Sequence, residues 1–95
     1  MEERSFHFPS ERKKELEKLL FEEKQLPRFP AEVDHISYLD GVKICFRDGG
    51  WIIARFSGTE PLLRIFCEMD VPEKAAGFCE QFVQFLGLTG DRRQG

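Results

Sequence analysis

The residues best suited to chemistry lie in one short stretch, 55–61, with the sequence Arg-Phe-Ser-Gly-Thr-Glu-Pro. Ser57 and Thr59 carry hydroxyl donors, and the amides of successive turn residues can converge on an anion. Gly58 has no Cβ, so its backbone can turn sharply and let a ligand approach the main chain. Arg55 adds a planar guanidinium, which suits a phosphate better than a lysine does. The stretch has the composition of a phosphate-binding loop. The alternative is a tight turn capped by its own hydroxyls, with the arginine in a surface ion pair.

The cysteines and histidines do not suggest a second chemical site. The three cysteines form no close pair in the sequence, which argues against a disulfide framework and against a zinc knuckle. Cys45 and Cys67 fall in predicted strands and Cys79 in a predicted helix, so we expect buried, reduced thiols. His7 and His35 lack partners at metal-ligand spacing, and we expect them to be structural or exposed to solvent. We predict no catalytic residue and no metal site in this chain.

Two apolar segments, 51–56 and 62–69, enter and leave the loop and are predicted to be the strands that position it. Asp40-Gly41 is a strong hairpin signal, and a further turn is expected over residues 48–50. The predicted elements, in chain order, are a helix over 10–23, strands over 33–39, 42–46, 51–56 and 62–69, and a helix that ends near residue 86. This order predicts an α+β fold, in which a four-stranded antiparallel sheet has two helices packed on one face.

Both predicted helices have boundary signals. Ser10 is the expected N-cap of the first helix. Asp70 is the expected N-cap of the second, with Pro72 in the first turn and Glu73 at the spacing of a capping box. Gly87 is the expected C-cap.

The third and fourth predicted strands are apolar at nearly every position, including Trp51, Ile53 and Phe66. A sheet with one solvated face should alternate more clearly between apolar and polar residues. We therefore infer that the second face of the sheet is partly covered.

Length and charge narrow the function classes. Ninety-five residues suffice for one small domain. We expect a leader or interdomain linker over residues 1–9, the domain over 10–88 and a flexible tail over 89–95. The net charge of −3 gives no general attraction for nucleic acid or for an anionic membrane, so an anion site must be local. No apolar run approaches the length of a membrane span and no signal region follows the first residues, so a cytoplasmic protein is expected.

The loop and its surroundings resemble a known family. The loop string, followed by Leu-Leu-Arg-Ile over residues 62–65, is similar to the phosphate-binding loop of the α-D-phosphohexomutases, which are the phosphoglucomutases, phosphomannomutases and phosphoglucosamine mutases. The likeness extends back through residues 39–44 and 48–51. It implies the C-terminal domain, domain 4, of such an enzyme, with a fold like that of the TATA-binding protein. The residues it implies as contacts of the substrate phosphate are Arg55, Ser57, Gly58 and Thr59, with Glu60 and Arg64 in supporting roles.

The resemblance also implies a function. Phosphohexomutases move a phosphoryl group between positions 1 and 6 of a hexose, through a bisphosphorylated intermediate that reorients in the cleft. This domain would bind the non-reacting phosphate of the hexose phosphate, and the other three domains of the parent enzyme would be its partners and cover the second sheet face. The family's phosphoserine, metal-binding and sugar-binding motifs are absent from this sequence. We therefore expect no cofactor in this domain, Mg²⁺ through a missing domain, and no mutase activity from this chain alone.

Alternatives remain at this point. The hairpin over residues 40–43 and the loop string favour the phosphoglucomutase/phosphomannomutase branch, with phosphoglucosamine mutase as the runner-up. The choice between glucose and mannose stays open. A free-standing anion-binding or interaction module without catalysis is a further alternative, which the parent reading frame would distinguish. A nucleic-acid binder rests on fold analogy alone, and the net negative charge disfavours it.

Overall fold

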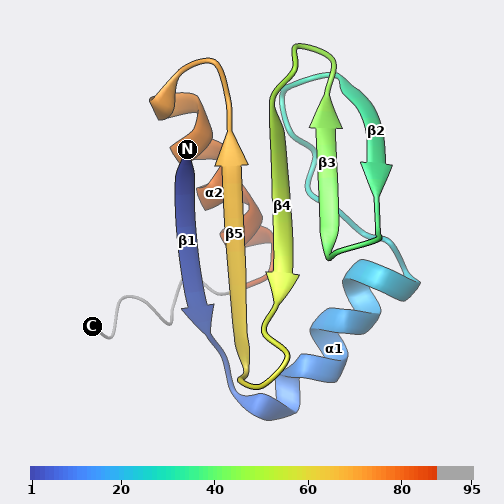
Figure 1. The fold of residues 1–95 in the computed structure, drawn as a ribbon. Helices are drawn as coiled ribbons and strands as arrows, with labels where there is room; N and C mark the ends of the chain where they lie inside the picture. Colours follow the sequence, from blue (N-terminus) through green and yellow to red (C-terminus); the bar gives the residue numbers. More distant parts are fainter. Residues whose placement is uncertain (88–95) are drawn as a thin grey trace.

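The computed structural model describes residues 1–87 (Figure 1). Its elements are β1 (Glu2–His7), the 3₁₀ turn η1 (Ser10–Arg12), α1 (Lys13–Glu17), the π turn η2 (Lys18–Glu22), β2 (Val33–Ser37), β3 (Val42–Phe46), β4 (Trp51–Phe56), β5 (Leu62–Glu68) and α2 (Pro72–Phe85). The α+β class is confirmed, because an antiparallel sheet and two helical segments share one core. The likeness to the TATA-binding protein stays a prediction. The expected tail over 89–95 lies outside the described residues.

The sheet has five strands in the order β1-β5-β4-β3-β2, so the prediction of four strands is wrong. Strands β2 to β5 form the expected antiparallel meander. The additional strand is β1, in the stretch expected to be a leader, and it pairs with β5 from Glu2↔Cys67 to His7↔Leu62. The charged residues of β1 obscure the apolar pattern by which a strand is predicted from sequence. Charged residues are nevertheless common in strands at the edge of a sheet. The Arg4 guanidinium lies 3.5 Å from the Glu80 carboxylate and so links β1 to α2.

One face of the sheet holds the core, and both helical segments cover that face, as predicted (Figure 1). Alternate residues of the strands point into it, such as Ile52 and Ala54 on β4 and Leu63 and Ile65 on β5. The first helical segment contributes Leu16 to the same core. The largest fully buried side chains are Phe82, Leu16, Leu20, Ile44, Ile52, Leu63, Ile65, Val42, Val83, Cys67 and Cys79.

The helix starts differ from the predicted caps. Neither Ser10 nor Asp70 makes an N-cap hydrogen bond; the residue before η1 is Pro9, and the N-cap of α2 is Val71. The residue before a proline favours an extended backbone, and Val71 has φ −130° and ψ 145°, so Pro72 moves the helix start beyond Asp70. The end of α2 is as predicted, because the next residue but one, Gly87, lies in the left-handed region at φ +73°.

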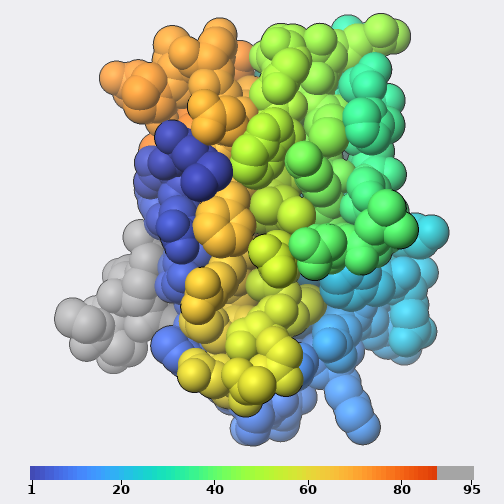
Figure 2. All heavy atoms as spheres, in the orientation of Figure 1, coloured from blue at the N-terminus to red at the C-terminus, as the bar shows by residue number. Residues whose placement is uncertain are grey.

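The second face of the sheet carries no element of residues 1–87, and we call it the open face. Figure 2 shows this face, with β4 and β5 near its centre. Trp51, Ile53 and Phe66 lie there half-buried, and the Lys43 ammonium stands 4.9 Å above the centre of the Trp51 ring. The inference that other domains cover this face stays a prediction. None of the helices in residues 1–87 is long and apolar enough to cross a membrane.

Candidate functional site

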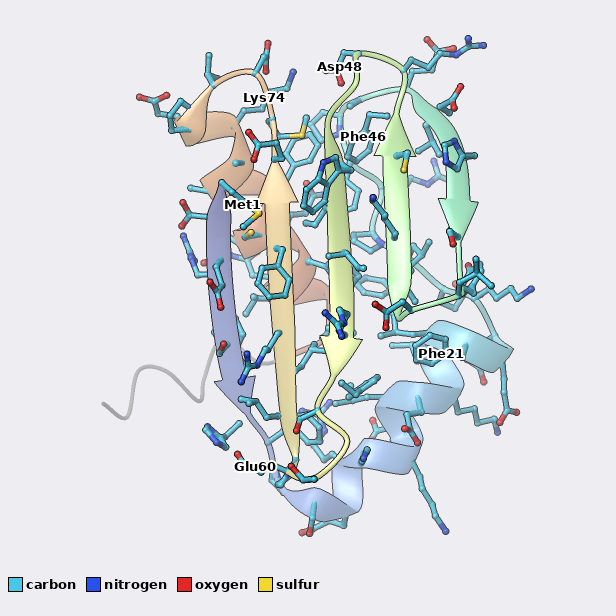
Figure 3. All side chains as sticks on the ribbon, in the orientation of Figure 1. Met1, Phe21, Phe46, Asp48, Glu60 and Lys74 are labelled. Atoms are coloured by element: carbon cyan, nitrogen blue, oxygen red, sulfur yellow. The ribbon has the colours of Figure 1, made fainter. Side chains whose placement is uncertain are left out.

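The loop over residues 57–61 joins β4 to β5 at one end of the sheet, where Figure 3 labels Glu60. Backbone hydrogen bonds close it: the Ser57 amide donates to the Leu62 carbonyl at 2.8 Å, and the Leu62 amide donates to the Glu60 carbonyl at 2.8 Å. The Phe8 amide donates to the Pro61 carbonyl at 3.0 Å and ties the loop to the chain after β1. The loop is therefore held from both flanking strands and from the N-terminal strand.

The Ser57 hydroxyl organises the loop. Its oxygen accepts hydrogen bonds from the amides of Thr59 and Glu60, each at 3.3 Å, and lies 3.5 Å from the Thr59 hydroxyl. The self-capped turn that the sequence offered as the alternative is therefore present. Two amides converge on one oxygen, as they would on an anion. The Gly58 amide has no hydrogen-bond acceptor among residues 1–87 and stays available to a ligand.

Two arginines stand beside the loop on the open face. Arg55 on β4 and Arg64 on β5 are direct cross-strand partners. The Arg55 Nε lies 3.5 Å from the Asp40 carboxylate, whereas Arg64 has no acidic partner within residues 1–87. Like charges directly opposite each other destabilise a sheet. The pair thus concentrates positive charge that only one nearby carboxylate offsets.

A hollow of about 210 Å³ opens between these arginines and the loop. Its lining residues are Arg55, Phe56, Ser57, Gly58, Arg64 and Phe66. A cationic concavity with a hydroxyl and a free amide in its wall can hold a small anion through charge-assisted hydrogen bonds.

The turn between β2 and β3 positions Arg55. Gly41 has φ +85°, and a Cβ there would lie 2.8 Å from the Arg55 Cγ and 2.4 Å from the Ala54 carbonyl oxygen. The Gly41 backbone therefore packs against the arginine stem while Asp40, next to it, holds the guanidinium. The Asp-Gly signal predicts a turn here but does not indicate which strand end the turn contacts.

The predicted site residues are brought together in part. Arg55, Ser57, Gly58 and Arg64 all line the hollow, but Thr59 and Glu60 do not. The Glu60 carboxylate lies 3.6 Å from the His7 Nε2 and makes no ion pair with an arginine of residues 1–87.

Gly58 does not need glycine for the fold. Its φ is not in the left-handed region, and a Cβ there would meet nothing within 4 Å. The chain does bend over residues 58–61, but the bend does not require glycine at position 58. Gly58 nevertheless lines the hollow, and its Cβ position is open space.

One further cation, Lys13, lies beside the loop and was not predicted from the sequence. The Lys13 ammonium donates a hydrogen bond to the Ser57 carbonyl at 3.5 Å. No local pattern could have shown this, because the two residues are far apart in the sequence and only the fold brings α1 to the loop.

The cysteines and the metal-ligand side chains of residues 1–87 do not form a second site. Cys67 and Cys79 are buried and free, as predicted, whereas Cys45 is only half-buried on the open face. A hydrogen bond with Cys79 and burial raise the pKa of Cys67, so its thiol stays protonated and is a poor nucleophile. Within residues 1–87 no group of three His, Cys, Asp or Glu side chains could hold a metal ion, so these residues do not fit an Mg²⁺ site.

Comparison with known families agrees with this fold and loop. Residues 11–85 match the family described as "Phosphoglucomutase/phosphomannomutase, C-terminal domain". The domain is therefore a C-terminal domain of the phosphohexomutase class, and the chain belongs to the phosphoglucomutase/phosphomannomutase C-terminal domain family. The resemblance noted from the loop string is confirmed.

Curated relatives include several sugar phosphate mutases. A phosphoglucomutase/phosphomannomutase of Thermococcus kodakarensis is 47% identical over 51 residues, which are 54% of this chain and 11% of that protein. A probable phosphoglucosamine mutase of Methanothermobacter thermautotrophicus is 47% identical over 45 residues, which are 47% of this chain and 10% of that protein. A phosphopentomutase of Thermococcus kodakarensis is 35% identical over 60 residues, covering 63% of this chain and 13% of that protein. The matched part is thus only a small share of each relative's length.

Proposed function

We propose that this domain binds the phosphate group of a phosphorylated sugar, through the loop over residues 57–61 and the two arginines beside it. The observation that carries the proposal is the cross-strand pair Arg55↔Arg64, in which one guanidinium lacks an acidic partner within residues 1–87. Such a pair weakens the sheet by itself. A dianion in the hollow would neutralise both charges and receive hydrogen bonds from Ser57 and the Gly58 amide.

In the parent enzyme this domain would bind the non-reacting phosphate of a hexose phosphate while the phosphoryl group moves between positions 1 and 6. Such a site must accept the sugar in two opposite orientations, so it should recognise the phosphate and not the sugar. Holding the remote phosphate also provides binding energy that orients the reacting one. The names of the relatives support recognition of the phosphate and not of the sugar, because these mutases are named for different sugars: glucose, mannose, glucosamine and pentose.

The other groups that a mutase reaction needs would come from the rest of the parent enzyme. We propose that three further domains supply the phosphoserine, the Mg²⁺ site and the sugar contacts, that they cover the open face, and that the enzyme is cytoplasmic. The 95-residue chain alone should then have no mutase activity. A phosphoglucosamine mutase parent is the runner-up, and a free-standing anion-binding module is the remaining alternative. A coupled assay with glucose 1-phosphate and the bisphosphate activator tests the inactivity, and turnover by the pure chain would contradict it.

The binding proposal is tested by titrating inorganic phosphate into the ¹⁵N-labelled chain and following the amide signals of Ser57, Gly58 and Thr59. Arg55→Gln and Arg64→Gln should each weaken binding about tenfold or more, the cost of a charged hydrogen bond. Arg47→Gln is the matched control, since Arg47 is another exposed arginine with a single ion pair, 3.5 Å from Glu32. Unchanged loop signals at high phosphate in the unmodified chain would rule out the site.

A further inference from the structure

The hollow beside the loop has an apolar wall that a phosphate group alone does not require. Phe66 lines it together with the two arginines and the loop residues. The hollow has a volume of about 210 Å³, which is more than the five heavy atoms of a phosphate require.

Phe66 is not used by the core. Its neighbours on β5, Ile65 and Cys67, are fully buried on the helix side, so the Phe66 ring lies on the open face and is half-buried there. Within residues 1–87 it stacks on no other aromatic ring. Its cross-strand partners are the aliphatic Ile53 on β4 and the exposed Glu3 on β1. The ring therefore presents free apolar surface next to a cationic site.

The strand sets the spacing between the backbone positions of Arg64 and Phe66. Arg64 and Phe66 are two residues apart on the same face of β5, which places them about 6.6–6.8 Å apart along the strand. One phosphorylated sugar spans that distance. If the arginines hold the phosphate of a sugar phosphate, the sugar can lie either over the Phe66 ring or away from it. Only the position over the ring removes apolar surface from water.

We propose that Phe66 is a specificity-determining platform, on which the carbon skeleton of a sugar phosphate packs while the arginines hold its phosphate. The C–H face of a pyranose and the face of a phenyl ring are both apolar, so the contact does not depend on which hydroxyl carries the phosphate. The site would then prefer a phosphate ester to inorganic phosphate without distinguishing the two ends of the sugar. This inference rests on the proposed function, because it requires the anion site.

The test uses the 95-residue chain and three probes: inorganic phosphate, glucose 1-phosphate and unphosphorylated glucose, titrated at pH 8, where both phosphates are largely dianions. Glucose 1-phosphate should bind more tightly than inorganic phosphate. Phe66→Ala should weaken the binding of glucose 1-phosphate about threefold to tenfold, the range of one aromatic contact, and leave inorganic phosphate within a factor of about two. Phe66→Leu keeps an apolar side chain, so it should lose less affinity for glucose 1-phosphate than Phe66→Ala does.

Ile53→Ala is the matched control, because Ile53 is a cross-strand partner of Phe66 but does not line the hollow. Ile53→Ala should leave the binding of inorganic phosphate and of glucose 1-phosphate unchanged. The platform is overturned if the unmodified chain binds both phosphates equally, or if Phe66→Ala weakens both to the same extent. If the unmodified chain binds neither, the anion site itself is wrong, and the platform is wrong with it.

Discussion

Arg55 and Arg64 face each other directly across β4 and β5, and among residues 1–87 only Arg55 has a carboxylate beside it. Opposed like charges on neighbouring strands cost about 0.2–1 kcal/mol relative to a neutral pair. Sheets commonly place opposite charges in such positions, so this arrangement is unfavourable for folding and favourable for binding an anion. The domain should therefore be less stable without an anion than its packing would allow.

Removing one charge of this pair should stabilise the domain. Arg64→Gln should raise the free energy of unfolding by up to about 1 kcal/mol in phosphate-free, low-salt buffer, and the gain should shrink as salt screens the repulsion. Urea unfolding at two ionic strengths measures both effects. Arg47→Gln loses one surface ion pair, so it should be neutral or slightly destabilising. A less stable Arg64→Gln variant in low salt would contradict the prediction.

Alanine substitutions at Gly41 and Gly49, the two turn glycines with positive φ, should destabilise the domain to very different extents. Gly49, at φ +99°, has open space around a Cβ, so Gly49→Ala should cost only backbone strain, about 1 kcal/mol. Gly41→Ala adds the collision with the Ala54 carbonyl and should cost about 2–4 kcal/mol. It should also displace Arg55 and weaken phosphate binding. Denaturant unfolding and phosphate titration of both variants provide the check, and equal destabilisation would show that the Gly41 contact is not important.

Much of this fold could be predicted because its signals are local. The Asp40-Gly41 turn and the apolar periods of α2 and the three strands from β3 to β5 each depend on a few neighbouring residues. β1 could not be predicted, because only Phe6 among its residues is buried and its pairing partner, β5, comes much later in the sequence. Its strand character comes from β5, which offers an unpaired edge.

The candidate site likewise has one part that the local sequence predicts and one part that only the fold reveals. Arg55, Ser57 and Gly58 are neighbours in the sequence, so their chemistry is visible there. Lys13 and Asp40 reach the site from other elements, and only the three-dimensional fold identifies them. Glu60 shows the limit of a motif, since its position in the string does not reveal that its carboxylate lies beside His7.

Stability at low pH should depend on Asp48, at the end of the sheet away from the loop, where Figure 3 labels it with Lys74. A hydrogen bond from the Gly50 amide, 2.9 Å from Asp48 Oδ1, and the nearby Lys74 ammonium lower its pKa below the usual 3.8. The folded state thus favours the carboxylate. Its stabilisation is present above pH 3.8 and is lost as the pH falls through the lower pKa of the folded state.

Asp48→Asn should therefore lower stability at pH 7, and the difference from the unmodified chain should shrink below about pH 4, where the aspartate becomes protonated. Thermal unfolding from pH 7 to pH 3 measures this. Glu22→Gln is the control, because Glu22 is exposed and has no ion-pair partner within residues 1–87. A stability difference for Asp48→Asn that stays constant with pH would mean that the charge on Asp48 contributes nothing.

Gly58 offers the sharpest separation of folding from binding. A Cβ there meets no protein atom and needs no unusual φ, so Gly58→Ala should change the free energy of unfolding by no more than about 0.5 kcal/mol. Gly58 lines the hollow, so a methyl group there should hinder a ligand that approaches its free amide, and phosphate affinity should fall about threefold to tenfold, the cost of one hydrogen bond.

Gly77→Ala provides the comparison, since Gly77 lies in α2 with nothing within 4 Å of its Cβ position. That change should stabilise the helix by up to about 1 kcal/mol and leave phosphate affinity unchanged. Phosphate titrations and urea unfolding of the two variants separate the effects. If Gly58→Ala binds phosphate as well as the unmodified chain does, the ligand does not approach the main chain at this position, and the arginines would have to hold the anion farther out on the open face.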